Sequence, residues 1–173
     1  MPMPMPRPRQ LTRRQQTLAT AAGRGALAGV AGVLAMTAGE KVEQRITRRK
    51  NSYVPGRALL VIAGQEPPDS ATPTVANHAL HWATGALLGS LRGVWAATGI
   101  RGAPATATHA VVRLAFDQTV ENTTGAGAPP STWPTQERVL DLALKSLYAV
   151  ATGLVADRWI APAAETRRGA HSH

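Results

Sequence analysis

The chain has 173 residues, enough for one domain, and its formal net charge of +9 leaves nucleic acid, an anionic membrane surface or an acidic protein as candidate partners. It contains no cysteine, which excludes disulfides, thiolate metal sites and a cysteine nucleophile. Alanine and glycine are abundant and there is a single phenylalanine, so bulky core side chains are scarce; small residues suit close helix packing in lipid.

The amino end predicts a disordered tail followed by a long helix. Residues 1–17 are rich in proline and arginine, which is typical of an extended tail. A helix is predicted over residues 18–48, but its uncharged part, residues 25–39, is only about 15 residues long, below the roughly 20 that cross a hydrocarbon core. Pro55 predicts a break after it.

Further along the chain, a short apolar run at residues 57–63 is too short to span a membrane and predicts an interfacial helix turn or a re-entrant piece. Apolar stretches bounded by glycine- and proline-rich loops predict three more helices, at residues 75–98, 105–121 and 135–160. Residues 162–173 predict a flexible polar tail. The predicted fold is therefore all-α: about four short, Ala/Gly-rich helices forming a membrane-embedded helical bundle over residues 18–161.

Charge is the main argument against this membrane interpretation. An arginine at the centre of a helix costs about 2.5–3.5 kcal/mol on insertion, and Arg113 lies near the middle of the third helix. These helices therefore insert only as a bundle in which charges face inward and pair. Four spans also place both termini on one side, which leaves the basic loop at residues 41–57 on the other side, against the positive-inside trend.

Small residues recur at helical spacing in three predicted helices. Gly25 and Gly29 form a GxxxG pair, Gly85, Gly89 and Gly93 form a tandem, and Ala149 with Gly153 forms a weaker pair. Residues one turn apart on one face allow two helix backbones to approach closely. The competing interpretation is that the pattern only reflects the high glycine content.

Polar residues also follow helical spacing, which places them on one stripe of each helix. The third helix carries such residues every four positions from His109, and the second carries Asn77, Thr84 and Arg92 mostly along one side. The candidates for a buried polar cluster are Glu40, Glu43, His78, His81, Arg113, Asp117, Glu121, Asp141 and Lys145.

Three interpretations of this cluster remain open: a structural network of ion pairs, a proton, ion or small-solute path, and a metal site. A two-metal carboxylate site in a bundle uses Glu-x-x-His on two helices, and the sequence lacks that spacing. No catalytic residue, metal ligand set or cofactor is predicted.

Three blocks, residues 36–44, 81–85 and 113–125, the last followed by Ala128-Pro129-Pro130, resemble small bacterial multi-helix membrane proteins of the YagU type. This resemblance covers roughly residues 18–160. It implies a helical fold in the bacterial inner (cytoplasmic) membrane, and it transfers no established chemistry to individual residues.

The leading hypothesis is a small integral membrane protein with a structural, interaction or envelope-stress role and no enzymatic activity. The alternatives are a small transporter, channel or proton relay that uses the polar stripe, and a soluble or membrane metal-binding bundle. The expected partner is the lipid bilayer, with a second copy or another membrane protein as further candidates. Nucleic acid is not expected, because stacking aromatics do not accompany the basic clusters.

Overall fold

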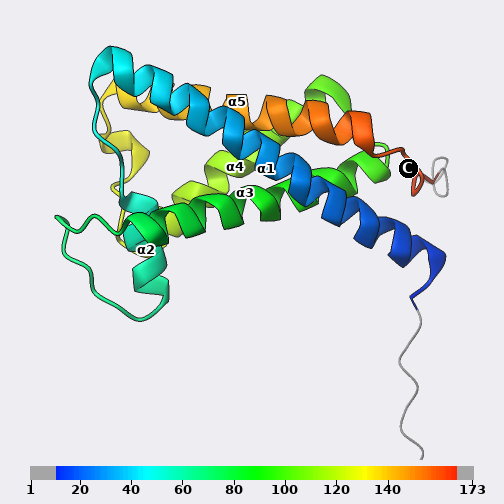
Figure 1. Cartoon of the computed structure of the whole chain (residues 1–173), viewed down its shortest axis with the longest axis horizontal. Coiled ribbons are helices and arrows are strands. Elements are labelled where there is room, and N and C mark those ends of the chain that lie inside the picture. Colours follow the sequence, from blue (N-terminus) through cyan, green and yellow to red (C-terminus); the bar gives the residue numbers. More distant parts are fainter. Residues whose placement is uncertain (1–10, 167–173) are drawn as a thin grey trace, which may run out of the picture.

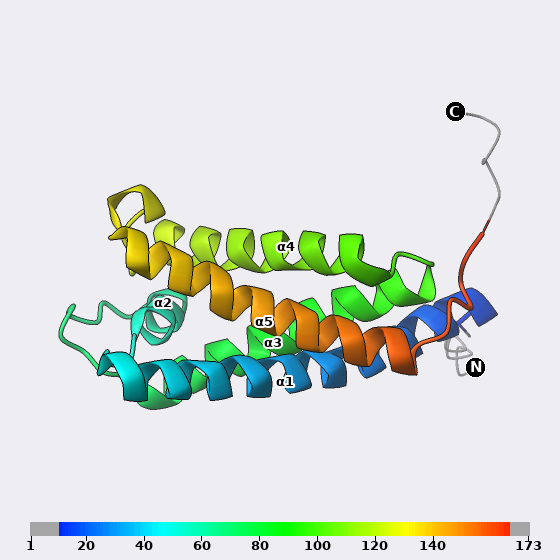
Figure 2. The ribbon, with the colours of Figure 1, turned by 90° about the horizontal axis from the view of Figure 1, so that it is seen from above.

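A computed structural model describes residues 11–166, and this part of the chain contains five α-helices, one 3-10 helix and no strand, which confirms the all-α prediction. The four long helices are α1 (Arg13–Thr47), α3 (Thr74–Ala97), α4 (Gly102–Thr123) and α5 (Thr135–Trp159). They run side by side in alternating directions, so the two ends of the described chain lie at the same end of the bundle (Figures 1 and 2).

Two shorter helices lie in the connections. The nine-residue α2 (Val54–Ile62) lies across one end of the bundle, where a short interfacial or re-entrant piece was predicted over residues 57–63 (Figure 2). Asn77 at the start of α3 accepts a hydrogen bond from the Gly56 N–H at 2.9 Å, which ties α2 to α3. A 3-10 turn, η1 (Pro130–Thr132), precedes α5.

The first helix begins five residues earlier than the sequence analysis placed it. Thr12 and Gln15 form a capping box, in which the Thr12 hydroxyl accepts from the Gln15 N–H and the Gln15 side chain accepts from the Thr12 N–H. This pairing satisfies two of the N–H groups that a helix start leaves free. Residues 13–17 are therefore helical, whereas residues 1–10 of the predicted tail lie outside the described residues.

The predicted carboxyl-terminal tail, residues 162–173, is also described only in part. Residues 167–173 lie outside the described part, but residues 162–166 pack back onto the bundle. The Ala164 N–H donates to the Ala97 carbonyl at 2.9 Å, and Ala164 is buried. This short segment thus closes the end of the bundle at which α3 ends.

Glycines permit the closest helix contact in the fold, between α1 and α3. A Cβ atom added to Gly25 would lie 2.7 Å from the Gly93 Cα, and one added to Gly29 would lie 2.9 Å from the Gly89 Cα. The two glycine patterns therefore face one another, and the helices cross with their backbones in contact (Figure 1). Gly85 lies on the same face of α3 beside Val33, while Gly153 on α5 faces Thr106 on α4.

The interior and the surface of the bundle are unusual for a protein in water. Apart from Tyr148, the largest fully buried side chains include Arg92 and His109, and most of the buried apolar residues are alanines. Bulky apolar side chains instead project outward from the middle of the long helices, with 37–69% of their surface exposed. We call this set the apolar belt: Leu27, Leu34, Leu87, Leu91, Val111, Leu147, Val150 and Leu154.

The exposed faces of the four long helices lack charge over a long distance. All four helices are fully described, and neither α3 nor α4 exposes an Asp, Glu, Lys or Arg side chain. On α1 the exposed charges stop at Arg24 and resume at Lys41, and on α5 they are absent between Arg138 and Arg158. At about 1.5 Å per residue, these uncharged faces extend about 26 Å and about 30 Å. By length and composition α1 and α5 could each cross a membrane, whereas the other helices do not meet that test.

Candidate functional site

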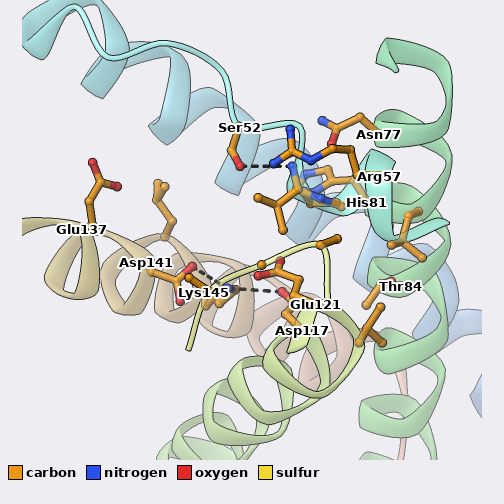
Figure 3. Close-up of a pocket in the computed structure, with 18 of the residues that line it drawn as sticks. Ser52, Arg57, Asn77, His81, Thr84, Asp117, Glu121, Glu137, Asp141 and Lys145 are labelled. Carbon is orange, nitrogen blue, oxygen red and sulfur yellow. Dashed lines mark hydrogen bonds and ion pairs between the residues drawn. The ribbon is translucent and has the colours of Figure 1, made fainter. Parts of the chain in front are cut away.

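A polar cavity of about 710 Å³ lies at the end of the bundle that α2 covers, with walls from all five α-helices and the loop before α5 (Figure 3). Seven of the nine predicted cluster residues line it: Glu40, His81, Arg113, Asp117, Glu121, Asp141 and Lys145. They come from α1, α3, α4 and α5, so positions up to 105 apart in the sequence meet around one space.

An ionic chain joins α4 to α5 along one wall of this cavity. The Lys145 ammonium contacts the Asp141 carboxylate one turn earlier on α5 and lies 3.4 Å from Asp117 on α4. Arg113, one turn before Asp117 on α4, donates from Nε to the same Asp117 oxygen, Oδ2, at 2.9 Å. Lys145 and Arg113 are almost fully buried, at 7% and 2% exposure, so their charges depend on these carboxylates.

Arg113 also links the cavity to the interior of the bundle. Its guanidinium carbon lies 4.8 Å from the centre of the Tyr148 ring, a cation–π contact. The Tyr148 hydroxyl donates to the Gly85 carbonyl on α3 at 2.7 Å, and the Arg113 Nη1 has no hydrogen-bond partner among the described residues. A cation of the cavity wall is thus stacked on an aromatic ring in the interior of the bundle.

Three of the lining carboxylates, Asp69, Glu121 and Glu137, form no ion pair with any described residue. Glu121 lies beside Asp117, whereas Glu137 stands apart nearer the start of α5 (Figure 3). The lining contains six carboxylates but only four lysine or arginine side chains. The cavity is therefore acidic in a chain whose net charge is +9.

The other two predicted cluster residues, Glu43 and His78, are not part of the cavity lining. Glu43 pairs with Arg49 at 3.2 Å. His78 is exposed near the start of α3, one turn before His81, whose ring lies 3.4 Å from the Thr37 hydroxyl. Within residues 11–166, no three histidine or carboxylate side chains converge on a point that could hold a metal ion.

A second polar cluster, at the opposite end of the bundle, joins α3, α4 and α5. Arg92 is fully buried and donates to Asp157 Oδ2 at 2.8 Å, and the Gly102 N–H at the start of α4 donates to the same oxygen at 2.9 Å. Arg101 donates to the carbonyls of Asp157 and Ile160. Asp157 thus neutralises a buried cation and caps the first turn of α4 from a neighbouring helix.

Sequence reasoning placed Arg92 on a polar side of its helix but did not single out Asp157. The available signal was weak: one carboxylate near the end of a helix that is otherwise apolar, 65 positions from its partner. His109 was noted only as part of the α4 stripe. It is fully buried, hydrogen-bonds the Leu88 carbonyl at 3.0 Å, and meets the Trp95 ring edge-on at 5.9 Å.

Comparisons with known proteins gave no match to a family model, a curated protein or a solved structure.

Proposed function

We propose that this chain is a small integral membrane protein in which α1, α3, α4 and α5 span the bilayer together. The observation that carries the proposal is the reversed polarity of the bundle: arginine, lysine and histidine inside, and the apolar belt outside. In water, this arrangement would expose apolar surface and bury cations, both at a cost. In a hydrocarbon core of about 30 Å, the same arrangement is favourable.

The uncharged faces support the same proposal for α3 and α4, which are less apolar than α1 and α5. Of the four Asp, Glu, Lys and Arg residues of α3 and α4, Arg92, Arg113 and Asp117 are paired inside the bundle. The fourth, Glu121, lines the cavity. Inward pairing of this kind lets a helix insert as part of a bundle although it would not insert alone. We place the protein in the bacterial inner membrane on the strength of its resemblance to the YagU type.

For the activity, we propose that the cavity binds a small cationic solute. Its volume of about 710 Å³ lies within the range of small-molecule sites, about 300–1,000 Å³. The surplus of carboxylates favours a cation, and Glu121 has no competing ion pair among the described residues. The ionic chain of Asp141, Lys145, Asp117 and Arg113 would hold α4 and α5 in register around the solute.

A purely structural role for the polar residues is the alternative, and the same ionic chain is the observation that favours it. Lys145 and Arg113 are already matched by Asp141 and Asp117, so these four residues need no ligand. Under this alternative, no small cation stabilises the protein, whatever residue stands at position 121.

The cation site is tested by ligand-induced thermal stabilisation of the purified protein in detergent micelles. Methylammonium and tetramethylammonium are expected to raise the melting temperature, and acetate at equal ionic strength is not. Glu121→Gln is expected to weaken apparent cation affinity roughly tenfold, because one charge-assisted contact is lost. Glu66→Gln is the matched control, because Glu66 is exposed in the α2–α3 loop and does not line the cavity.

Two outcomes would contradict a cation site at Glu121. If Glu121→Gln and Glu66→Gln respond to both cations as the unmodified protein does, Glu121 does not bind the solute. If neither cation shifts the melting temperature of the unmodified protein, the structural role is the better account of the cavity.

A further inference from the structure

The carboxyl end of α1 and the residues after it carry a group of cations that the cavity does not use. We call this group the basic collar: Lys41, Arg45, Arg48 and Lys50, all exposed and without an ion pair to any described residue. The two carboxylates on this part of α1, Glu40 and Glu43, are both paired with Arg49. The collar therefore presents positive charge that its own neighbourhood does not neutralise.

Bulky apolar side chains lie directly beside the collar on the same helix. Val42 is 57% exposed and Ile46 is 77% exposed. They continue a row of exposed residues at four-residue spacing, Leu34, Ala38, Val42 and Ile46, that leads from the apolar belt to the end of the helix. At this spacing the side chains form one stripe, next to the stripe of Lys41, Arg45 and Arg48.

A shallow hollow of about 680 Å³ opens between the collar and the start of α2. Its lining is rich in cationic and hydroxyl groups, including Lys41, Lys50, Ser52, Tyr53, Arg57 and Thr72. Arg57 donates to the Asp69 carbonyl at 3.0 Å, but its buried Nε has no partner among the described residues. These donors suit the oxygen atoms of a phosphate group.

We propose that the basic collar and this hollow bind anionic phospholipid head groups at the surface of the membrane that the bundle spans. Cations beside exposed apolar side chains are the arrangement by which helices recognise an anionic membrane interface. Val42 and Ile46 enter the boundary of the acyl chains, while Lys41, Arg45 and Lys50 meet the phosphates. The proposal rests on the membrane-spanning bundle and adds the class of lipid and the end of the bundle that binds it.

This assignment also explains the basic loop that conflicts with the positive-inside trend. A loop that is held at head groups by its own cations gains free energy from anionic lipid on whichever side it lies. Nucleic acid would account for the cations but leaves the row from Leu34 to Ile46 without a role. A bilayer accounts for both features.

Lipid retention measured by native mass spectrometry tests the proposal. The protein is reconstituted in vesicles of phosphatidylcholine mixed with phosphatidylglycerol and then released into detergent, and the two retained lipids are compared. The unmodified protein is expected to retain phosphatidylglycerol preferentially. The triple variant Lys41→Gln, Arg45→Gln, Lys50→Gln is expected to lose roughly tenfold or more of this preference.

A charge-conserving triple variant, Lys41→Arg, Arg45→Lys, Lys50→Arg, is the matched control and keeps the preference. Arg48 stays unchanged in both variants, because it ends α1 with a positive φ of 61°. An unchanged preference in the glutamine variant overturns the proposal, as does an equal loss in the charge-conserving variant. Retention of inorganic phosphate in place of phosphatidylglycerol assigns the hollow to a free anion and overturns the bilayer assignment.

Failure of the membrane proposal itself gives a different result. In that case the protein does not remain with phosphatidylcholine vesicles after an alkaline wash, and neither lipid is retained. Loss of lipid preference alone, with the protein still in the vesicles, refutes only the head-group site.

Discussion

Asp157→Ala is expected to lower the free energy of unfolding by about 3–5 kcal/mol. The substitution leaves the fully buried Arg92 guanidinium without its carboxylate and also removes the acceptor for the Gly102 N–H at the start of α4. A buried charge without a partner costs far more than the pair itself contributes. Unfolding in mixed micelles with increasing sodium dodecyl sulfate, followed by circular dichroism, measures the change.

A double variant distinguishes the cost of the unpaired charge from the cost of lost side-chain packing. Arg92→Met with Asp157→Leu is expected to recover much of the lost stability, because an apolar pair of similar size leaves no buried charge. Glu66→Ala, in an exposed loop, is expected to have little effect. If Asp157→Ala unfolds at the same detergent fraction as Glu66→Ala, the cluster at this end does not hold the bundle together.

Gly29→Ala and Gly23→Ala are expected to change stability in opposite directions although both lie in α1. A Cβ at position 29 would meet the backbone of Gly85 and Gly89, so α1 and α3 must separate, at a cost of about 1–3 kcal/mol or more. A Cβ at position 23 has no atom within 4 Å, and replacing glycine by alanine within a helix gains about 0.5–1 kcal/mol.

Unfolding in mixed micelles also measures these two substitutions. The free energy of unfolding is expected to fall for Gly29→Ala and to rise for Gly23→Ala. Composition alone would give both glycines the same effect, since both lie inside the same alanine- and glycine-rich helix. Equal stabilisation by the two substitutions would show that α1 and α3 do not meet at Gly29.

Helix type and order were predictable, because proline- and glycine-rich loops interrupt apolar stretches of helical length. The beginning of α1 was missed by five residues, although its signal, Thr12 followed three positions later by Gln15, was present in the sequence. The glycine pattern indicated close packing but not its partner. A repeat on one helix cannot show which other helix it meets, and that pairing depends on how the whole bundle assembles.

The residues of the candidate site were also predicted only in part. Four-residue spacing placed Arg113, Asp117 and Glu121 on one side of a helix, and the structure places all three at the cavity. Helical spacing also suggested Glu43 and His78, but neither lines the cavity. The sequence of one helix does not determine which of its sides faces the neighbouring helices. The Arg92–Asp157 pair was missed since each residue is a single charge whose partner is distant in the sequence.

Chemical labelling of single cysteines tests the central proposal, that the apolar belt faces lipid. The chain has no cysteine, so Leu34→Cys, Leu87→Cys and Val150→Cys each create one thiol in the belt, and Glu66→Cys creates one in an exposed loop. In native membranes, N-ethylmaleimide is expected to react with the Glu66→Cys thiol but not with the belt thiols, because thiolate does not form in hydrocarbon. All four react after sodium dodecyl sulfate is added. Belt thiols that react as fast as the Glu66→Cys thiol before detergent would place the belt in water and contradict the membrane-spanning bundle.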